Sequence, residues 1–391
     1  MQRARIAITT LLICTACTAS DTSPTTTDQP EQNMRAILDT SLERGRSFLL
    51  HNQKAEGNFE YEYNFVDRTF SPDDNQVRQA GALWGLALIH HDNPTVETRE
   101  ALERGFAFFR EHAKTLPDGR MIIAYPGDDH GGTGTVSLVI LALTEFLRTE
   151  GSIALQEKYQ PFYEGLLQFL RTLRKADGHF DSDYDLSGQS YGYADPYANG
   201  EALLAMAKAA KYRGHSELWG EILGSAHRMH QTYITDALQE DPDSATTKGF
   251  YQWGTMSFFE IATSNKADPA LFTTWAVNLA EWMIDVHKTL DRPRNTAYAY
   301  EGIISAWELA RRAGDQTATE KLGHVIGEGL RKLTSWQVGG PIPNEYLLRN
   351  PTDDPHAVGG VMNHRAEPQL RIDVTQHQMH AVILARRYVY R

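Results

Sequence analysis

The stretch Asp177-Gly178-His179-Phe180, which is followed by Tyr184, is one copy of a pattern that occurs three times in the first half of the chain. The other copies are Glu56-Gly57-Asn58-Phe59 with Tyr63 and Asp118-Gly119-Arg120-Met121 with Tyr125. They recur at intervals of roughly 60 residues, which is typical of a repeat architecture. In each copy an acidic residue and a glycine predict a turn that ends a helix and leads into a short extended run.

Helical patterns of two kinds surround these turns. Amphipathic stretches precede them (42–52, 101–116 and 163–175), and stretches that are apolar on nearly all sides follow them (80–89, 136–147 and 202–210). A helix with one apolar stripe lies at a surface, whereas a helix that is apolar all round has to be enclosed by protein. We therefore expect outer amphipathic helices to alternate with inner apolar helices.

Beyond residue 215 the glycine signature fades, but the helical alternation continues. The expected helices are 217–238, 252–263, 269–290, 296–313, 317–336 and 374–390. This gives about six helix pairs, and repeat units that cannot bury their faces alone have to stack into one body. We predict an all-α fold in which residues 34–391 form a single (α/α)6 toroid of six helical hairpins with short β-hairpin-like loops.

The beginning of the chain has the layout of a secretory signal. Basic residues Arg3 and Arg5 precede an apolar stretch that is too short to span a bilayer. Small residues before Cys17 resemble the lipobox of bacterial lipoproteins, although Cys14 is not the preferred residue at its position. We expect a signal peptide over 1–16 and a lipid anchor at Cys17; an ordinary signal peptide cleaved nearby is the alternative.

Residues 17–33 are rich in Ser, Thr, Asp, Gln and Pro, which predicts a disordered tether. The residue after Cys17 is Thr18 rather than Asp, so the expected location is the bacterial outer membrane, with the domain in the periplasm or on the cell surface. Both cysteines lie in the leader, which excludes thiol chemistry in the domain. The net charge of −12 argues against nucleic acid and against membrane contact other than through the anchor. We expect a monomer without a cofactor or metal.

The alternation of six inner and six outer helices resembles the (α/α)6 toroids of carbohydrate-active enzymes, which include six-hairpin glycosidases, polysaccharide lyases and uronyl epimerases. The resemblance covers the whole mature domain and rests on architecture, because the chain contains no motif that is diagnostic of one family. It implies an active cleft where the inner helices begin.

All six of these beginnings carry polar or aromatic residues. Sugar hydroxyls need paired donors and acceptors, and apolar ring faces stack on Tyr and Trp. A glycan is therefore the expected partner, and the predicted substrate-binding residues are Asn75, Arg78, His130, Tyr191, Tyr193, Tyr197, Trp253, Asn295, Tyr298, Arg371, Gln376 and His380.

Four carboxylates are candidates for catalysis. Asp195 precedes Pro196, so helix capping is its alternative role. Glu201 and Glu301 lie inside inner helices among apolar neighbours, where a buried charge requires either an ion-pair partner or a functional cavity. Asp373 is the fourth candidate for a catalytic carboxylate.

Asp373, His377 and His380 have the spacing i, i+4 and i+7, which places them on one helix face. A histidine held by a carboxylate is suited to be a general base, so His377 is the fifth catalytic candidate. Zinc binding with help from His364 and simple packing of the histidines along the axis are the alternatives.

The predicted function is an extracytoplasmic enzyme that processes a polysaccharide or oligosaccharide. A glycoside hydrolase is favoured and would use two of the four carboxylates. A lyase or epimerase of uronate polymers comes next, with Tyr and His377 as acid and base and with Arg78, Arg294 or Arg371 neutralising the uronate.

Two further alternatives stay open. One is a non-catalytic lipoprotein that binds a glycan or a protein. The other is a terpenoid-cyclase-like toroid, whose repeats resemble the acid-Gly-aromatic turn; the run 181–185 is only similar to the acidic motif of those enzymes. The irregular stretch 338–370 is long for a connection, and we expect it to fold over the cleft as a lid.

Overall fold

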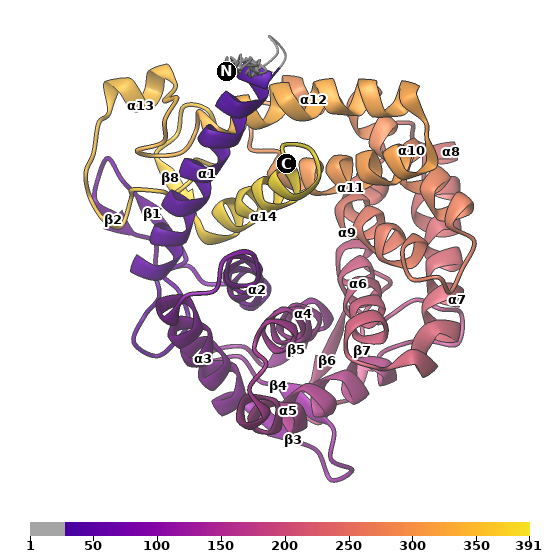
Figure 1. The fold of residues 1–391 in the computed structure, drawn as a ribbon. Helices are drawn as coiled ribbons and strands as arrows, with labels where there is room; N and C mark the ends of the chain where they lie inside the picture. Colours follow the sequence, from indigo (N-terminus) through magenta and orange to yellow (C-terminus); the bar gives the residue numbers. More distant parts are fainter. Residues whose placement is uncertain (1–27) are drawn as a thin grey trace, which may run out of the picture.

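The computed structural model describes residues 28–391 and shows a closed ring of helices (Figure 1). In this part of the chain six helices form an inner ring, each packed against the next, and the last packs against the first. These inner helices are α2 (Gln76–Asp92), α4 (Thr133–Thr149), α6 (Pro196–Tyr212), α9 (Ala245–Ala262), α11 (Ala297–Ala313) and α14 (Ile372–Tyr388). The predicted (α/α)6 toroid is confirmed.

An outer helix packs against each inner helix. The outer helices are α1 (Asp28–His51), α3 (Val96–Glu111), α5 (Ile153–Thr172), α7 (Trp219–His230), α10 (Pro269–Asp285) and α12 (Gln316–Thr334). The π-helical turn η2 (Gln231–Asp236) joins α7 to α8 (Ala237–Glu240); η1 (Ser216–Leu218), η3 (Thr289–Asp291) and α13 (Glu345–Arg349) lie in connections. No helix in residues 28–391 is long and apolar enough to cross a membrane.

Helix α1 begins at Asp28, before the domain start that we predicted at residue 34. Residues 28–33 therefore belong to the first outer helix rather than to the tether. The hydrophilic composition that suggested a tether is also compatible with the beginning of an amphipathic outer helix. The signal peptide, Cys17 and the remainder of the predicted tether lie outside the described residues.

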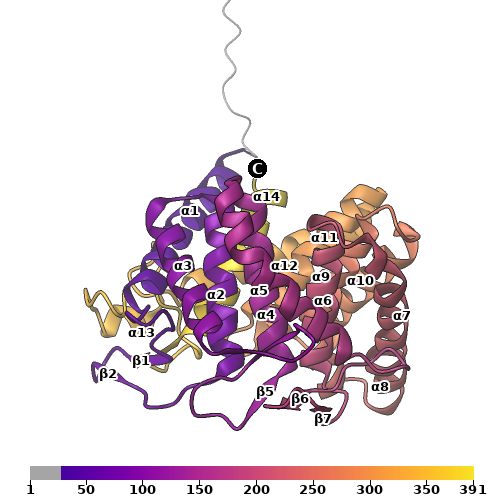
Figure 2. The same ribbon diagram turned by 90° about the horizontal axis from the view of Figure 1, so that it is seen from below.

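Short antiparallel strands form the loops at one end of the toroid. The sheet order is β2 (Thr69–Phe70), β1 (Glu62–Asn64), β8 (Gln369–Arg371) in one sheet, β3 (Ala113–Thr115) with β4 (Met121–Ile123) in another, and β5 (His130–Gly132), β6 (Asp183–Asp185), β7 (Ser190–Tyr191) in a third. Figure 2 shows β1, β2, β5, β6 and β7 at the end opposite the C-terminus. Strands β5 and β8 lead directly into α4 and α14, so the strands lie where inner helices begin.

The repeated acid-Gly turn has the same geometry in its three copies. In each, the glycine N–H donates to the carbonyl three residues earlier: Gly57 to Lys54, Gly119 to Leu116 and Gly178 to Lys175. The glycines have φ values of 108°, 89° and 100°, which lie in the region where a side chain is strained. The sequence pattern therefore encodes one backbone turn.

A buried side-chain amide ties two of these turns to an inner helix. Asn199 on α6 accepts from the backbone N–H of Phe180 at 2.9 Å and donates to its carbonyl at 2.8 Å. Gln79 on α2 makes the same pair of bonds with Phe59, both at 2.8 Å. Each amide pairs two backbone groups that would otherwise be buried without partners, so it fixes the loop relative to the start of its helix.

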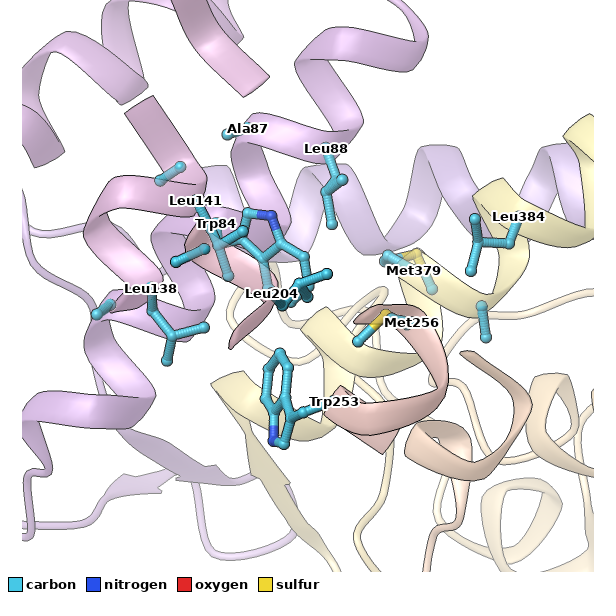
Figure 3. Close-up of a cluster of buried hydrophobic side chains, with 14 of the residues drawn as sticks. Trp84, Ala87, Leu88, Leu138, Leu141, Leu204, Trp253, Met256, Met379 and Leu384 are labelled. Carbon is cyan, nitrogen blue, oxygen red and sulfur yellow. The ribbon is translucent and has the colours of Figure 1, made fainter. Parts of the chain in front are cut away.

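Large apolar side chains fill the axis of the ring. Trp84 is fully buried, and its ring centroid lies 5.6 Å from that of Trp253. Figure 3 shows these two rings with Met256, Met379 and surrounding leucines, contributed by different inner helices. The toroid is consequently a packed core with a closed axis, and a ligand has to bind at an end of it.

Paired charges occupy the ends of the inner helices opposite the strands. Lys208 donates to the buried Glu145 and lies 3.7 Å from Glu260, which also accepts from Lys211 at 2.7 Å. Arg148 completes the cluster at 3.2 Å from Glu145. Arg148 and Lys211 lie in the last turns of α4 and α6, where the helix dipole favours positive charge.

The irregular stretch 338–370 does not form the lid that we expected. It is held against the toroid by backbone bonds such as Val338 N–H to the Gly360 carbonyl at 2.9 Å, and β8 at its end pairs with β1. Of its residues, Asn363 lines the cavity described below. The prolines and glycines of this stretch serve its turns along the side of the toroid.

We predict that Asn199→Ala lowers the free energy of unfolding by about 2 kcal/mol, because two buried backbone groups of Phe180 lose their partner. The measurement is chemical denaturation of the variant and the wild type. Gln316→Ala is the control, since this exposed amide bonds only to Glu320 on its own helix and its loss should cost less than about 0.5 kcal/mol. Equal stability of the two variants would contradict the role assigned to Asn199.

Candidate active site

A cavity of about 580 Å³ lies at the end of the toroid where the six inner helices begin. Thirteen of the predicted site residues line it: Asn75, Arg78, Tyr193, Asp195, Tyr197, Glu201, Trp253, Asn295, Tyr298, Arg371, Asp373, Gln376 and His377. They come from every inner helix except α4 or from the loops before them, and α4 contributes Gly134 and Leu138. The position of the predicted cleft is confirmed.

Glu201 is a buried carboxyl group in the wall of this cavity. The residue is 5% exposed, and in residues 28–391 no hydrogen bond or ion pair engages its side chain. A Cβ atom at position 134 would collide with its Oε2, so Gly134 makes room for it. Burial, and secondly the charge of Asp195, raise the pKa of Glu201 well above the ordinary value. Burial therefore favours the neutral form of this carboxyl group in the cavity wall.

Asp195 caps helix α6, as the alternative interpretation held. Its Oδ1 accepts from the backbone N–H of Ala198 at 2.9 Å, and Pro196 follows it as the first helical residue. Its Oδ2 lies 3.4 Å from the hydroxyl of Tyr193. Because Asp195 also lines the cavity, one carboxylate both starts the helix and faces a ligand.

Asp373 is held by two arginines. Arg371 binds it through Nε at 2.6 Å and through Nη2 at 3.0 Å, and Nε of Arg78 lies 3.3 Å from its Oδ2. Arg371 comes from the strand before α14, and Arg78 comes from α2. The ion pair between Arg78 and Asp373 therefore also joins the first and last inner helices. The predicted catalytic carboxylate is thus a member of a compact charged triad in the cavity wall.

His377 is oriented by Glu301 and not by Asp373. Nδ1 of His377 lies 3.1 Å from Oε1 of Glu301, and Gln252 donates to the other carboxylate oxygen. His380 has its Nδ1 3.3 Å from Oε1. Burial favours the neutral forms, but the attraction between the charges is stronger: the pKa of His377 is raised by Glu301, and the pKa of Glu301 is lowered by the two histidines.

Four predicted site residues do not line the cavity. Glu301 is fully buried behind His377, and His380 lies one turn deeper on α14, where its ring meets that of Trp84 at 5.0 Å. His130 bonds to Asp129 at 2.8 Å, and Tyr191 is 47% exposed on β7. The structure therefore does not place these four residues in the cavity wall, where we expected them. The depth of a residue along its inner helix and the direction of its strand decide where these side chains lie. Neither can be read from sequence spacing.

The structure adds residues that the sequence analysis missed, namely Lys248, Gln252, Ser182, Asp183 and Asn363. We did not predict Lys248 as a site residue because α9 begins at Ala245, whereas we expected this helix to begin near residue 252. Ser244, whose side chain caps the helix, was the signal that locates this start. Arg294, considered as a uronate ligand, pairs in a backbone bridge with His364 and does not line the cavity.

Within residues 28–391 no group of three or more His, Cys, Asp or Glu side chains is arranged to hold a metal ion. His364, the fourth ligand of the zinc alternative, instead lies 3.4 Å from Glu367. Nδ1 of both histidines on α14 is directed at Glu301. The zinc interpretation of the α14 histidines is therefore wrong for this arrangement.

No protein-family model matches this chain. No curated protein matches it in sequence. Solved structures do resemble it: a sugar epimerase from a ruminal bacterium has a TM-score of 0.64 at 11% identity, with 90% of this chain and 99% of that chain covered.

Cellobiose 2-epimerase from Bacillus thermoamylovorans has a TM-score of 0.63 at 9% identity, covering 91% of this chain and 100% of that chain. An α-1,6-mannanase of a Salegentibacter species, solved in complex with α-1,6-mannotetrose, has a TM-score of 0.60 at 8% identity, covering 90% and 98%. At such low identity these similarities establish the architecture. The chain has the (α/α)6 toroid fold found in carbohydrate-active epimerases and hydrolases.

Proposed function

We propose that the protein is a glycoside hydrolase that cleaves an oligosaccharide or polysaccharide in the cavity above the inner helices. The observation that carries the proposal is the buried carboxyl of Glu201 in the cavity wall, which has no hydrogen-bond or ion-pair partner in residues 28–391 and whose pKa is raised by burial. Such a group can donate a proton to the oxygen of a glycosidic bond as it breaks. Asp195, whose charge helps to keep Glu201 protonated, is the second carboxylate.

Glycoside hydrolysis requires two carboxyl groups at the cleft, and we assign these roles to Glu201 and Asp195, which both line the cavity. Glu201 acts as the general acid, and the Asp195 carboxylate activates water or attacks the sugar. Exposed aromatic rings beside them support a sugar ligand: Tyr193 is 67% exposed and Tyr197 is 42% exposed, and both line the cavity. The structural neighbours with sugar epimerase and mannanase activity agree with a glycan ligand.

Glu201→Gln should reduce turnover by about 10³-fold, because the amide cannot donate the proton. The measurement follows new reducing ends from a panel of neutral and acidic oligosaccharides. Glu157→Gln on the exposed surface of α5 is the matched control and should retain wild-type turnover. A Glu201→Gln enzyme as fast as the wild type would exclude this mechanism.

The same variant has a pH signature that does not require a substrate. Since the pKa of Glu201 is raised in the folded state above the ordinary 4.5, the stability associated with its neutral form is complete below that value and is lost as pH rises through the raised pKa. Glu201→Gln removes this loss, so its stability relative to the wild type should increase as the pH rises above 4.5. Denaturation at several pH values measures it; a constant difference would show that the carboxyl is not neutral.

An isomerase or epimerase is the second candidate, and the pair of His377 and Glu301 favours it. His377 lines the cavity while Glu301 fixes its Nδ1, an arrangement that can move a proton beside a sugar carbonyl. This reaction changes the identity of a reducing sugar without creating new reducing ends. Product analysis by chromatography therefore separates it from hydrolysis.

Glu301→Gln should lower the pKa of His377, because the negative charge that raises it is removed. Titration of the histidine signals by NMR measures this shift. His324, which is exposed on α12 and lies 3.6 Å from Glu328, should titrate alike in both proteins. An unchanged His377 titration would contradict the pairing.

We further propose that the protein is an outer-membrane lipoprotein anchored at Cys17, with its domain in the periplasm or at the cell surface. The proposal rests on the apolar leader, the small residues before Cys17 and Thr18 after it. Wild-type protein should incorporate radiolabelled palmitate and fractionate with the outer membrane, and Cys17→Ser should lose both properties. Labelling that persists in Cys17→Ser would refute this anchor site.

A further inference from the structure

Lys248 is a cation in the cavity wall between two aromatic rings. Its Nζ donates to the hydroxyl of Tyr197 at 2.6 Å and lies 5.3 Å from the centre of that ring. The ring of Tyr298, from α11, is 5.1 Å away on another side. All three side chains line the cavity, so a lysine with two flanking tyrosines faces any ligand there.

No carboxylate in residues 28–391 forms an ion pair with Lys248. Asp243, the acidic residue just before α9, instead forms ion pairs with His287 at 2.7 Å and Arg292 at 3.3 Å. The arginines of the cavity differ in this respect, because Arg78 and Arg371 share Asp373. The positive charge that is available to a ligand is therefore that of Lys248.

The position of Lys248 in its helix is unfavourable without an anion. It is the fourth residue of α9, and the N-terminal end of a helix carries partial positive charge that repels cations. In the first turns of the described inner helices Arg78 is the other basic residue, and it is paired with Asp373. An anionic ligand would relieve this repulsion.

We propose that Lys248, with Tyr197 and Tyr298, forms a subsite for a negatively charged substituent of the glycan, such as a carboxylate, sulfate or phosphate group. The proposal rests on the glycan-binding cleft proposed above and assigns its substrate class. The tyrosines provide ring faces and hydroxyls for the sugar, and the ammonium group binds the anion. Lys248 is then the residue that selects acidic over neutral glycans.

The test is calorimetric titration of the full-length protein in the Glu201→Gln background, so that the ligand is not consumed. The probes are size-matched neutral, uronate, sulfated and phosphorylated oligosaccharides at low salt. We expect at least one anionic class to bind about 10-fold more tightly than its neutral counterpart. Lys248→Met should abolish the preference, and Lys248→Arg should keep most of it. Lys266→Met, on the exposed turn after the other end of α9, should not change it.

The outcomes separate this proposal from the hydrolase proposal. Equal affinity for neutral and anionic probes, or a preference that survives Lys248→Met, would overturn the subsite even if the wild type cleaves glycans. A preference that depends on Lys248 without turnover by the wild type would support the subsite and reject the hydrolase.

Thermal denaturation adds a readout that is independent of ligands. Removal of a cation from the start of α9 should leave the melting temperature of Lys248→Met equal to or above that of the wild type. A lower melting temperature would show that Lys248 stabilises the fold, which contradicts the proposed role.

Discussion

The contact between α14 and α2 is the constraint on which the rest of the structure depends. Inner helices that are apolar on nearly all sides need neighbours on both flanks, and an open arc would expose a flank of the first and of the last. Closure of the ring buries both of these flanks and packs Trp84 of α2 against His380 of α14. The salt bridge from Arg78 to Asp373 spans the same junction. Because the ring is closed and its axis is filled, residues from loops far apart in the chain converge on one cavity.

Unpaired charged residues distinguish the two ends of the ring. At the end opposite the strands, Glu145 and Glu260 form ion pairs with Lys208 and Lys211. At the strand end, Glu201 and Lys248 have no partner of opposite charge in the described residues. Burial of unpaired groups lowers the free energy of unfolding, and the large apolar core offsets this cost. Unpaired groups at a cavity are the groups that a ligand can bind, and this difference supports the proposed site at the strand end.

Much of the fold follows from local patterns. The acid-Gly turns and the alternation of amphipathic and apolar helices predict six hairpins, and the polar residues at the helix starts predict the cleft that contains Asp195, Glu201 and His377. The interaction partners of these side chains cannot be predicted from local sequence patterns. Spacing alone placed Asp373 beside His377, but the arginines bind Asp373 and Glu301 from another hairpin holds the histidine. A wrong start for α9 hid Lys248, because its position relative to the cavity depends on where the helix begins.

The sequence by itself determined the class of fold, the number of hairpins and the end of the toroid at which the cavity lies, since these depend on turn chemistry and on the periodicity of apolar residues along one segment at a time. Tertiary structure decided which carboxyl groups are paired, which are buried, and in which direction their pKa values shift. Glu201 and Glu301 look alike in the sequence, each a glutamate inside an apolar helix. Packing of α14 against α11 brings two histidines to Glu301 and none to Glu201, whose pKa rises because burial is not compensated. Protonation depends on neighbours from other hairpins, and only the assembled ring supplies them.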